Sequence, residues 1–163
     1  MIAEKSALRV AGHILMSKAL GWDLPEVENV GQAIPGPFIV RWETLEYPSS
    51  ADHFADVFVT LAGPIASGEL AASGDVDVAH ARALLGEDGG FAEFVATVEA
   101  VLARHKAALD ALVAIFQIGF TSDADVDEAL EAVDRDLIGS ITHPRALLPV
   151  HVPGSKAGPG SPN

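Results

Sequence analysis

Histidines near carboxylates are the groups in this chain whose types and spacing could do chemistry. The chain has no cysteine, so a bound metal ion would need imidazole and carboxylate ligands. His53 in SADHFAD could supply ligands for a metal site together with Asp52, Asp56, Glu43 or Glu46; the alternative is an exposed residue at a helix start among acidic residues. His80 follows Asp77 by three residues, a spacing that places both on one helix face. The alternative for His80 is an ordinary surface position.

Two other patterns could indicate calcium binding and nucleophilic catalysis. The acidic run SDADVDEALEAVDRD, which begins at Ser122, has the carboxylate oxygens that calcium prefers. It lacks the glycine that an EF-hand loop needs at its sharp turn, so we expect an exposed helix start capped by Ser122. No G-x-S-x-G motif is present, and neither Ser67 nor Ser73 has a His/Asp pair in its sequence context. The sequence therefore predicts no nucleophile.

The composition is typical of one soluble domain. The 163 residues, 49% of them hydrophobic, are enough to build a single core. The formal net charge of −13 argues against nucleic acid and anionic membranes as partners, because both attract Lys and Arg; a cationic partner is compatible with it. We see neither a signal-like N-terminus nor an apolar run of about 18 residues, and we expect a cytoplasmic protein.

Hydrophobic periodicity and capping residues predict a mostly helical α+β domain with a small two-stranded sheet after the first helix. The expected elements are about five helices, at 3–20, 50–66, 75–85, 91–118 and 123–138, and two strands, at 26–31 and 37–45. His105 lies in the longest helix, where we expect its side chain to be exposed. Residues 1–148 should form a single domain, and residues 149–163 a Pro/Gly-rich tail.

Four short segments carry a resemblance to a known family. They are AGH followed by an aliphatic residue at 11–14, ALGW at 19–22, LAGPIAS at 61–67 and DVDVAHARALL at 75–85. With these segments the chain resembles the zinc-metallopeptidase domain of the FtsH-type ATP-dependent AAA proteases, particularly the small free-standing proteins that share that domain. The resemblance covers about residues 5–138 and implies a zinc-peptidase-like helical fold. The chain contains no G-x-x-x-x-G-K-[ST] phosphate loop.

The resemblance assigns roles to individual positions. In the family, H-E-x-x-H supplies two zinc ligands and a general base, and a later Asp is the third ligand. In this chain the motif is the degenerate RVAGH, so Arg9 replaces the first ligand, Val10 replaces the general base, and His13 retains the second ligand. Asp77 matches the third ligand, and Asp75 is the alternative if the register shifts by two residues.

These replacements predict a site without a metal. A catalytic zinc needs about three protein ligands and a water molecule, whereas His13 and Asp77 supply two. The Arg9 guanidinium stays protonated and repels a dication, and Val10 cannot accept a proton. We expect no cofactor, and zinc is improbable; His13, Asp77 and His53 are weak candidate ligands. Instead, Arg9 should pair with Asp77 in the place of the metal. Ser67 also departs from the family, which usually has Glu there.

The sequence leaves three functional hypotheses open. The first is a catalytically inactive metallopeptidase-like protein retained for protein binding or self-assembly, through residues 149–163 and the former substrate groove. The second is an enzyme whose His/Asp/Arg pocket acts on a small polar substrate. The third is a residual zinc peptidase with a rearranged site. The loss of the general base and of one ligand favours the first.

Overall fold

The structure is a computed structural model that describes residues 2–21, 24, 26–29, 38–41, 50–87, 89–118 and 122–133. The predicted tail at 149–163 lies outside the described residues, as does the last part of the predicted closing helix, 134–138. Within the described residues, no helix is both long and apolar enough to cross a membrane.

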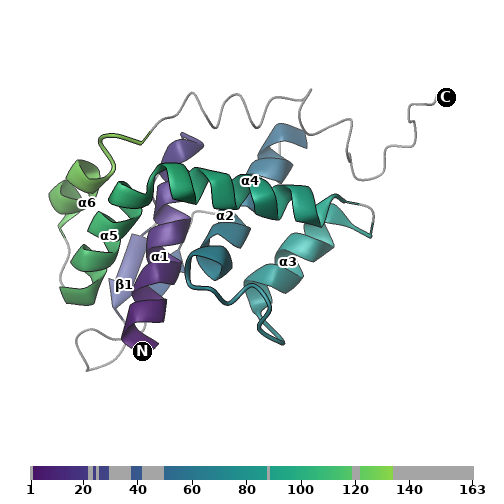
Figure 1. Cartoon of the computed structure of the whole chain (residues 1–163), viewed down its shortest axis with the longest axis horizontal. Coiled ribbons are helices and arrows are strands. Elements are labelled where there is room, and N and C mark those ends of the chain that lie inside the picture. The colour runs from purple at the N-terminus through teal and green to yellow at the C-terminus, as the bar shows by residue number, and fades with distance from the viewer. Residues whose placement is uncertain are drawn as a thin grey trace.

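Six helices and one pair of short strands make up the described part of the chain, which confirms the mostly helical class (Figure 1). The helices are α1 (Ile2–Ala19), α2 (Ser50–Ala66), α3 (Val76–Leu85), α4 (Phe91–Arg104), α5 (Lys106–Ile118) and α6 (Asp123–Ala129), and the strands are β1 (Glu26–Asn29) and β2 (Phe38–Arg41). The two strands are antiparallel, with Glu26 opposite Arg41 and Asn29 opposite Phe38. The remaining residues of the two predicted ranges, 30–31, 37 and 42–45, lie outside the described residues.

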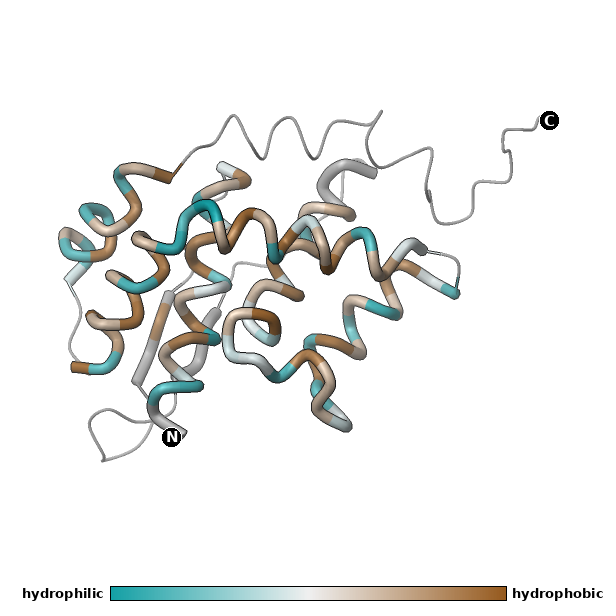
Figure 2. Tube along the Cα trace, in the orientation of Figure 1, coloured by the Kyte–Doolittle hydropathy of each residue, from teal (hydrophilic) through white to brown (hydrophobic). Residues whose placement is uncertain are grey.

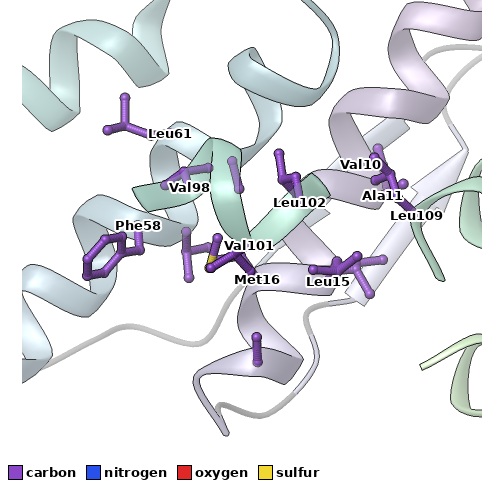
Figure 3. Packing of buried hydrophobic residues seen from close by; sticks show 14 of the residues in the cluster. Val10, Ala11, Leu15, Met16, Phe58, Leu61, Val98, Val101, Leu102 and Leu109 are labelled. Atoms are coloured by element: carbon purple, nitrogen blue, oxygen red, sulfur yellow. The ribbon is translucent and has the colours of Figure 1, made fainter. Parts of the chain in front are cut away.

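Helix α1 lies at the centre of the core. It packs chiefly against α2 and α5, while α2 also contacts α3 and α4. Apolar positions recur along α1, α4 and α5, whereas α6 is mainly hydrophilic (Figure 2). The buried apolar residues of α1 are Ala7, Val10, Ala11, Ile14, Leu15, Met16 and Ala19. Several of these meet apolar side chains of α2, α4 and α5 in one continuous cluster (Figure 3). The helix that carries Arg9 and His13 is therefore held firmly on its apolar side.

The single helix predicted across residues 91–118 is wrong, because the chain leaves the helical conformation at His105. There φ is −104° and ψ is 30°, and α5 begins at the next residue. The break lets α5 pack beside α1 while α4 packs against α2. His105 is also buried, contrary to the exposure expected from the sequence. The apolar spacing continues through the break, so periodicity alone predicts one uninterrupted helix.

Helix α6 begins as predicted and ends earlier. The hydroxyl of Ser122 accepts a hydrogen bond from the amide of Asp125, which confirms the expected cap. The helix stops at Ala129, and Leu130 and Val133, which follow it, are both buried. Burying these two side chains requires the chain to turn into the core, which overrides the helical propensity of the sequence after position 129.

Candidate functional site

The site is built where the first helix meets the start of α3. Asp75 is the N-cap of α3, and its Oδ1 accepts hydrogen bonds from the amides of Asp77 at 3.0 Å and Val78 at 3.1 Å. These bonds satisfy amides that the helix leaves unpaired, which explains why an Asp at this position starts a helix. The cap also fixes Asp77 in the first turn of α3, so both carboxylates are presented together toward α1.

Arg9 joins α1 to this helix start. Its Nη1 donates to Asp75 Oδ2 at 2.7 Å and its Nη2 to Asp75 Oδ1 at 3.0 Å, a bidentate arrangement. Its Nη2 also donates to Asp77 Oδ2, which confirms the predicted Arg9–Asp77 ion pair. Asp75 was predicted only as an alternative to Asp77, but Arg9 binds both. The Arg9 side chain is 23% exposed, so the cluster lies at the edge of the core with limited access to water.

His13 lies one helical turn after Arg9 and is buried. Its Nδ1 lies 2.8 Å from the carbonyl oxygen of Val59, and since a carbonyl only accepts, Nδ1 carries a proton and donates it. Its Nε2 lies 3.4 Å from Asp77 Oδ2, the oxygen that Arg9 also contacts. Arg9, His13 and Asp77, which the sequence suggested as site residues, are therefore brought together at one carboxylate oxygen.

Gly63 on α2 makes room for the His13 ring. A Cβ atom at position 63 would lie 2.2 Å from His13 Nε2, closer than any side chain could tolerate. Gly12 allows a similar close approach, because a Cβ there would lie 2.4 Å from the carbonyl oxygen of Ala62. The two glycines bring α1 and α2 close together beside His13. Both lie in segments that carried the resemblance, AGH and LAGPIAS.

The electrostatics of the cluster favour charged carboxylates. Hydrogen bonds from Arg9 hold the pKa of Asp75 below its usual value of 3.8, against the opposing effect of burial. For Asp77, burial raises the pKa, but the hydrogen bonds from His13 and Arg9 outweigh it, so its pKa is also lowered. Burial alone would lower the pKa of Arg9, but the hydrogen bonds to Asp75 and Asp77 have a larger opposite effect, so its pKa is raised overall. The ion pairs are therefore complete at neutral pH.

Glu69 belongs to the cluster and was missed in the sequence. Its Oε2 lies 3.6 Å from Arg9 Nη1 and accepts a hydrogen bond from Ser67 Oγ at 2.8 Å. The segment around Glu69 reads as a turn of small residues, and nothing in its spacing indicates a site. One signal was available, because Glu69 lies two residues after Ser67, where the resemblance expects a Glu. The carboxylate of Glu69 therefore lies beside Ser67, the position where the resemblance implies a Glu.

Val10 provides no chemistry at the site. Its side chain is 3% exposed and belongs to the apolar cluster of the core. An aliphatic group cannot accept or donate a proton, so the position expected to hold a general base is inert. The groups that remain can form ion pairs and hydrogen bonds, with three carboxylates facing one guanidinium.

The other candidate residues lie apart from this cluster. His80 is exposed, as the alternative for it proposed, and its Nε2 faces Asp56 of α2 at 3.3 Å rather than Asp77. His53 lies in the first turn of α2, but its side chain is outside the part of the chain that the structure describes. Within the described residues, no group of three or more His, Asp and Glu side chains is placed to hold a metal ion.

Comparison of the chain with protein-family models, with characterised proteins and with solved structures finds no match in any of the three.

Proposed function

We propose that this chain is a catalytically inactive, metallopeptidase-like protein, retained for protein binding or assembly, in which the Arg9 guanidinium takes the place of a zinc ion. The observation that carries the proposal is the convergence of three positions on one oxygen. Arg9 Nη2 and His13 Nε2 both face Asp77 Oδ2. Positions 9 and 13 are one helical turn apart, and Asp77 comes from a different helix. These are the three positions to which the resemblance assigns zinc ligands.

The spacing of the remaining ligands supports the proposal. Two ligands that each lie about 2.1 Å from a tetrahedral zinc ion are about 3.4 Å apart. His13 Nε2 and Asp77 Oδ2 are 3.4 Å apart. The hydrogen bond of Nδ1 to Val59 leaves Nε2 as the nitrogen directed at Asp77, which is how a second interaction usually orients a ligating histidine. His13 and Asp77 therefore have the spacing of two zinc ligands, and the Arg9 guanidinium lies beside them as the cation.

The same contacts argue against hydrolysis. A dication at the centre of the site would lie beside a guanidinium that is always protonated, and two carboxylates already satisfy that guanidinium. A metal-bound water molecule would also lack a proton acceptor at Val10. A role for Arg9 in binding an anionic substrate has less support, because Asp75, Asp77 and Glu69 surround it with excess negative charge.

The experiment that tests the proposal restores the missing ligand. Arg9→His should give His13 and Asp77 a third partner, and we expect the variant to gain one zinc ion per chain relative to the wild type. Isothermal titration with zinc measures the gain, and thermal unfolding with and without zinc gives an independent readout, because a ligand bound only by the folded state stabilises it. The matched control is Arg9→His combined with His13→Gln, which should lose the added ion.

A folded Arg9→His variant that gains no zinc would contradict the metallopeptidase-like arrangement. Wild-type zinc binding that depends on His13 would contradict the replacement of zinc by Arg9. Under the proposal, the wild-type chain should not hydrolyse an unfolded protein substrate such as casein. Hydrolysis that a chelator abolishes and that His13→Gln also abolishes would favour the residual peptidase instead.

The binding role is tested separately. Among the described residues, β1 and β2 pair only with each other, so an extended peptide could add to an outer strand edge by main-chain hydrogen bonds. We expect either self-association in light scattering over a range of protein concentrations or saturable binding of an extended, unstructured peptide in titration calorimetry. A strictly monomeric chain that binds no such peptide would remove this part of the proposal while leaving the zinc result unaffected.

A further inference from the structure

Helix α5 carries apolar residues on two opposite faces. Its inner face holds Leu109, Leu112 and Phe116, which are buried in the core where α5 packs against α1. Helix positions two residues apart are about 200° apart around the axis, so the set that begins two residues before Leu109 points away from α1. This set, which we call the outer seam, comprises Ala107, Ala111, Ala114 and Ile118.

The outer seam is open to solvent. Ala107 and Ala114 are exposed, and Ala111 is partly exposed. Ile118 is 68% exposed and is one of two large apolar side chains that are exposed in the described part of the chain. Exposed helix positions are usually filled by Lys, Glu or Gln, which form helices well and keep a surface soluble. A helix at the surface of a domain needs one apolar face, so the second face of α5 indicates another packing partner.

The spacing of the outer seam predicts that this partner is a helix. The four positions follow one another at intervals of four, three and four residues, which is the a and d spacing of a coiled coil. Three of the four residues are alanines. A second helix can therefore approach at the short end of the usual range of interaxial distances, about 8 Å.

The outer seam is complementary to itself when two copies run antiparallel. A two-fold axis between positions 112 and 113 places Ile118 of one copy opposite Ala107 of the other, and it places Ala111 opposite Ala114. The one large side chain of the seam then faces a small one, whereas a parallel pair would place two isoleucines together. The helix dipoles also oppose each other in the antiparallel arrangement, which is favourable.

The charges near the two ends of α5 favour the same arrangement. Arg104 and Lys106 are exposed at its start. The acidic first turn of α6, with Asp123 and Asp125, begins five residues after its end. An antiparallel pair brings the basic start of each α5 toward the acidic turn of the other copy, whereas a parallel pair would place like charges together. Lys106 also pairs with Asp110 of its own helix, but both side chains are exposed, so this contact is weak.

We propose that the outer seam of α5 is the contact between two copies of this chain, which pack antiparallel about a two-fold axis. The inference rests on the assembly role proposed above and names its surface and its partner. A helix of 13 residues is about 20 Å long, so the seam buries less than the roughly 1,200–2,000 Å² typical of a stable interface. The dimer is therefore weak, and its population depends on the protein concentration.

Sedimentation equilibrium of the full chain over about 5–500 μM, in the presence of a chelator, measures the association. We expect a reversible equilibrium between monomer and dimer. Ala111→Glu should raise the dissociation constant at least about tenfold, because the new carboxylate would be buried at the centre of the seam without a partner. The matched control is Ala100→Glu, the same replacement at an exposed position of α4, which should leave the dissociation constant unchanged.

The chain has no cysteine, which allows a direct test of the orientation. Ala107→Cys and Ile118→Cys chains, mixed under oxidising conditions, should form a mixed disulfide, because these two positions meet across the two-fold axis. Neither chain alone should cross-link. Equivalent positions at the ends of two antiparallel seams are about 16 Å apart along the axis, whereas a disulfide needs Cα atoms within about 7 Å.

Each contrary result overturns the inference. A wild type that stays monomeric at about 500 μM has no such contact. If Ala111→Glu dimerises as the wild type does, the copies meet through another surface, and the assembly role stands without this inference. If Ala111→Glu lowers the melting temperature of the monomer, another segment of the same chain covers α5. Cross-linking of Ala107→Cys with itself would indicate a parallel pair. None of these results changes the zinc binding expected of Arg9→His, so failure of this inference and failure of the proposed function are distinguishable.

Discussion

Replacing Arg9 by Met removes one charge while preserving most of the length of the side chain, and it tests how far the ion cluster stabilises the fold. Arg9 makes hydrogen bonds to Asp75 and Asp77 and lies near Glu69. Without the guanidinium, these three carboxylates would face one another across the space between α1 and α3. The hydrogen bonds from Arg9 help to lower the pKa of Asp75 and of Asp77, so its removal takes away part of what stabilises their charged forms.

The magnitude follows from burial. Leaving a fully buried charge without its partner costs about 3–5 kcal/mol. Here the side chains of Arg9 and Asp77 are 23% and 31% exposed, so water offsets part of that cost, whereas Asp75 is only 8% exposed. We expect Arg9→Met to lower the free energy of unfolding by about 2 kcal/mol. Urea unfolding at pH 7 in the presence of a chelator measures it, since the chelator prevents zinc from entering the opened site.

The control for Arg9→Met is the same replacement in a chain that already carries Asp75→Asn and Asp77→Asn. Asn caps a helix about as well as Asp, so the start of α3 should be preserved. In that background no carboxylate pair remains at the helix start, and Arg9→Met should cost less than about 1 kcal/mol. An equal cost in both backgrounds, or a cost below about 0.5 kcal/mol in the wild type, would refute the claim that Arg9 acts through these two carboxylates.

Three further predictions follow from the same geometry. The lowered pKa values of Asp75 and Asp77 mean that the folded state binds fewer protons than the unfolded state near pH 4. The stabilisation that these two carboxylates contribute is therefore present above the unfolded pKa of 3.8 and is lost as the pH falls through their folded pKa values. Urea unfolding at pH 7 and at pH 3 should show that the free energy of unfolding falls less between these pH values for Arg9→Met than for the wild type. Arg9→Lys keeps the charge and loses the bidentate bonds to Asp75, so thermal unfolding should show a cost of about 1 kcal/mol, smaller than that of Arg9→Met. Gly63→Ala should cost about 1–3 kcal/mol despite the better helix propensity of Ala, because the new Cβ would displace the His13 ring; unchanged stability would mean that the ring is not confined there.

The sequence predicted the helices well where a cap and an apolar stripe coincide. The predicted helix at 50–66 has the observed bounds of α2, and the predicted helix at 75–85 differs from α3 by one residue, the capping Asp75 itself. The break at His105 was not predictable, because it changes the direction of the chain without changing the spacing of buried residues. Packing of α5 against α1 decides that break, and packing between distant segments leaves no mark in local periodicity.

Only part of the candidate site could be predicted from the sequence, because some of its contacts also depend on how distant segments pack. Arg9 and Asp77 were expected to pair because both positions came from one motif pattern, and the structure brings them together. Glu69 was missed because it lies in a turn of small residues, where neither charge nor spacing distinguishes it from any solvated acid. Its place beside Arg9 depends on how the chain leaves α2, including the hydrogen bond from Ser67. Such a contact can be seen only once the turn is folded.

Under the proposed function, the three carboxylates near position 9 explain why an arginine would replace the first zinc ligand. A site that merely lost its zinc would leave Asp77 beside the buried His13, with Asp75 and Glu69 close by and no cation to neutralise them. A neutral residue at position 9 would then destabilise the contact between α1 and α3. Arginine is long enough to span that contact, keeps its charge when partly buried, and binds a carboxylate with two parallel bonds. Once the metal-bound water is gone, a carboxylate at position 10 has no proton to accept, and Val10 can join the core instead. Under the proposed function, the two changes are therefore parts of one conversion, from a helix that holds a metal to a helix held by an ion pair.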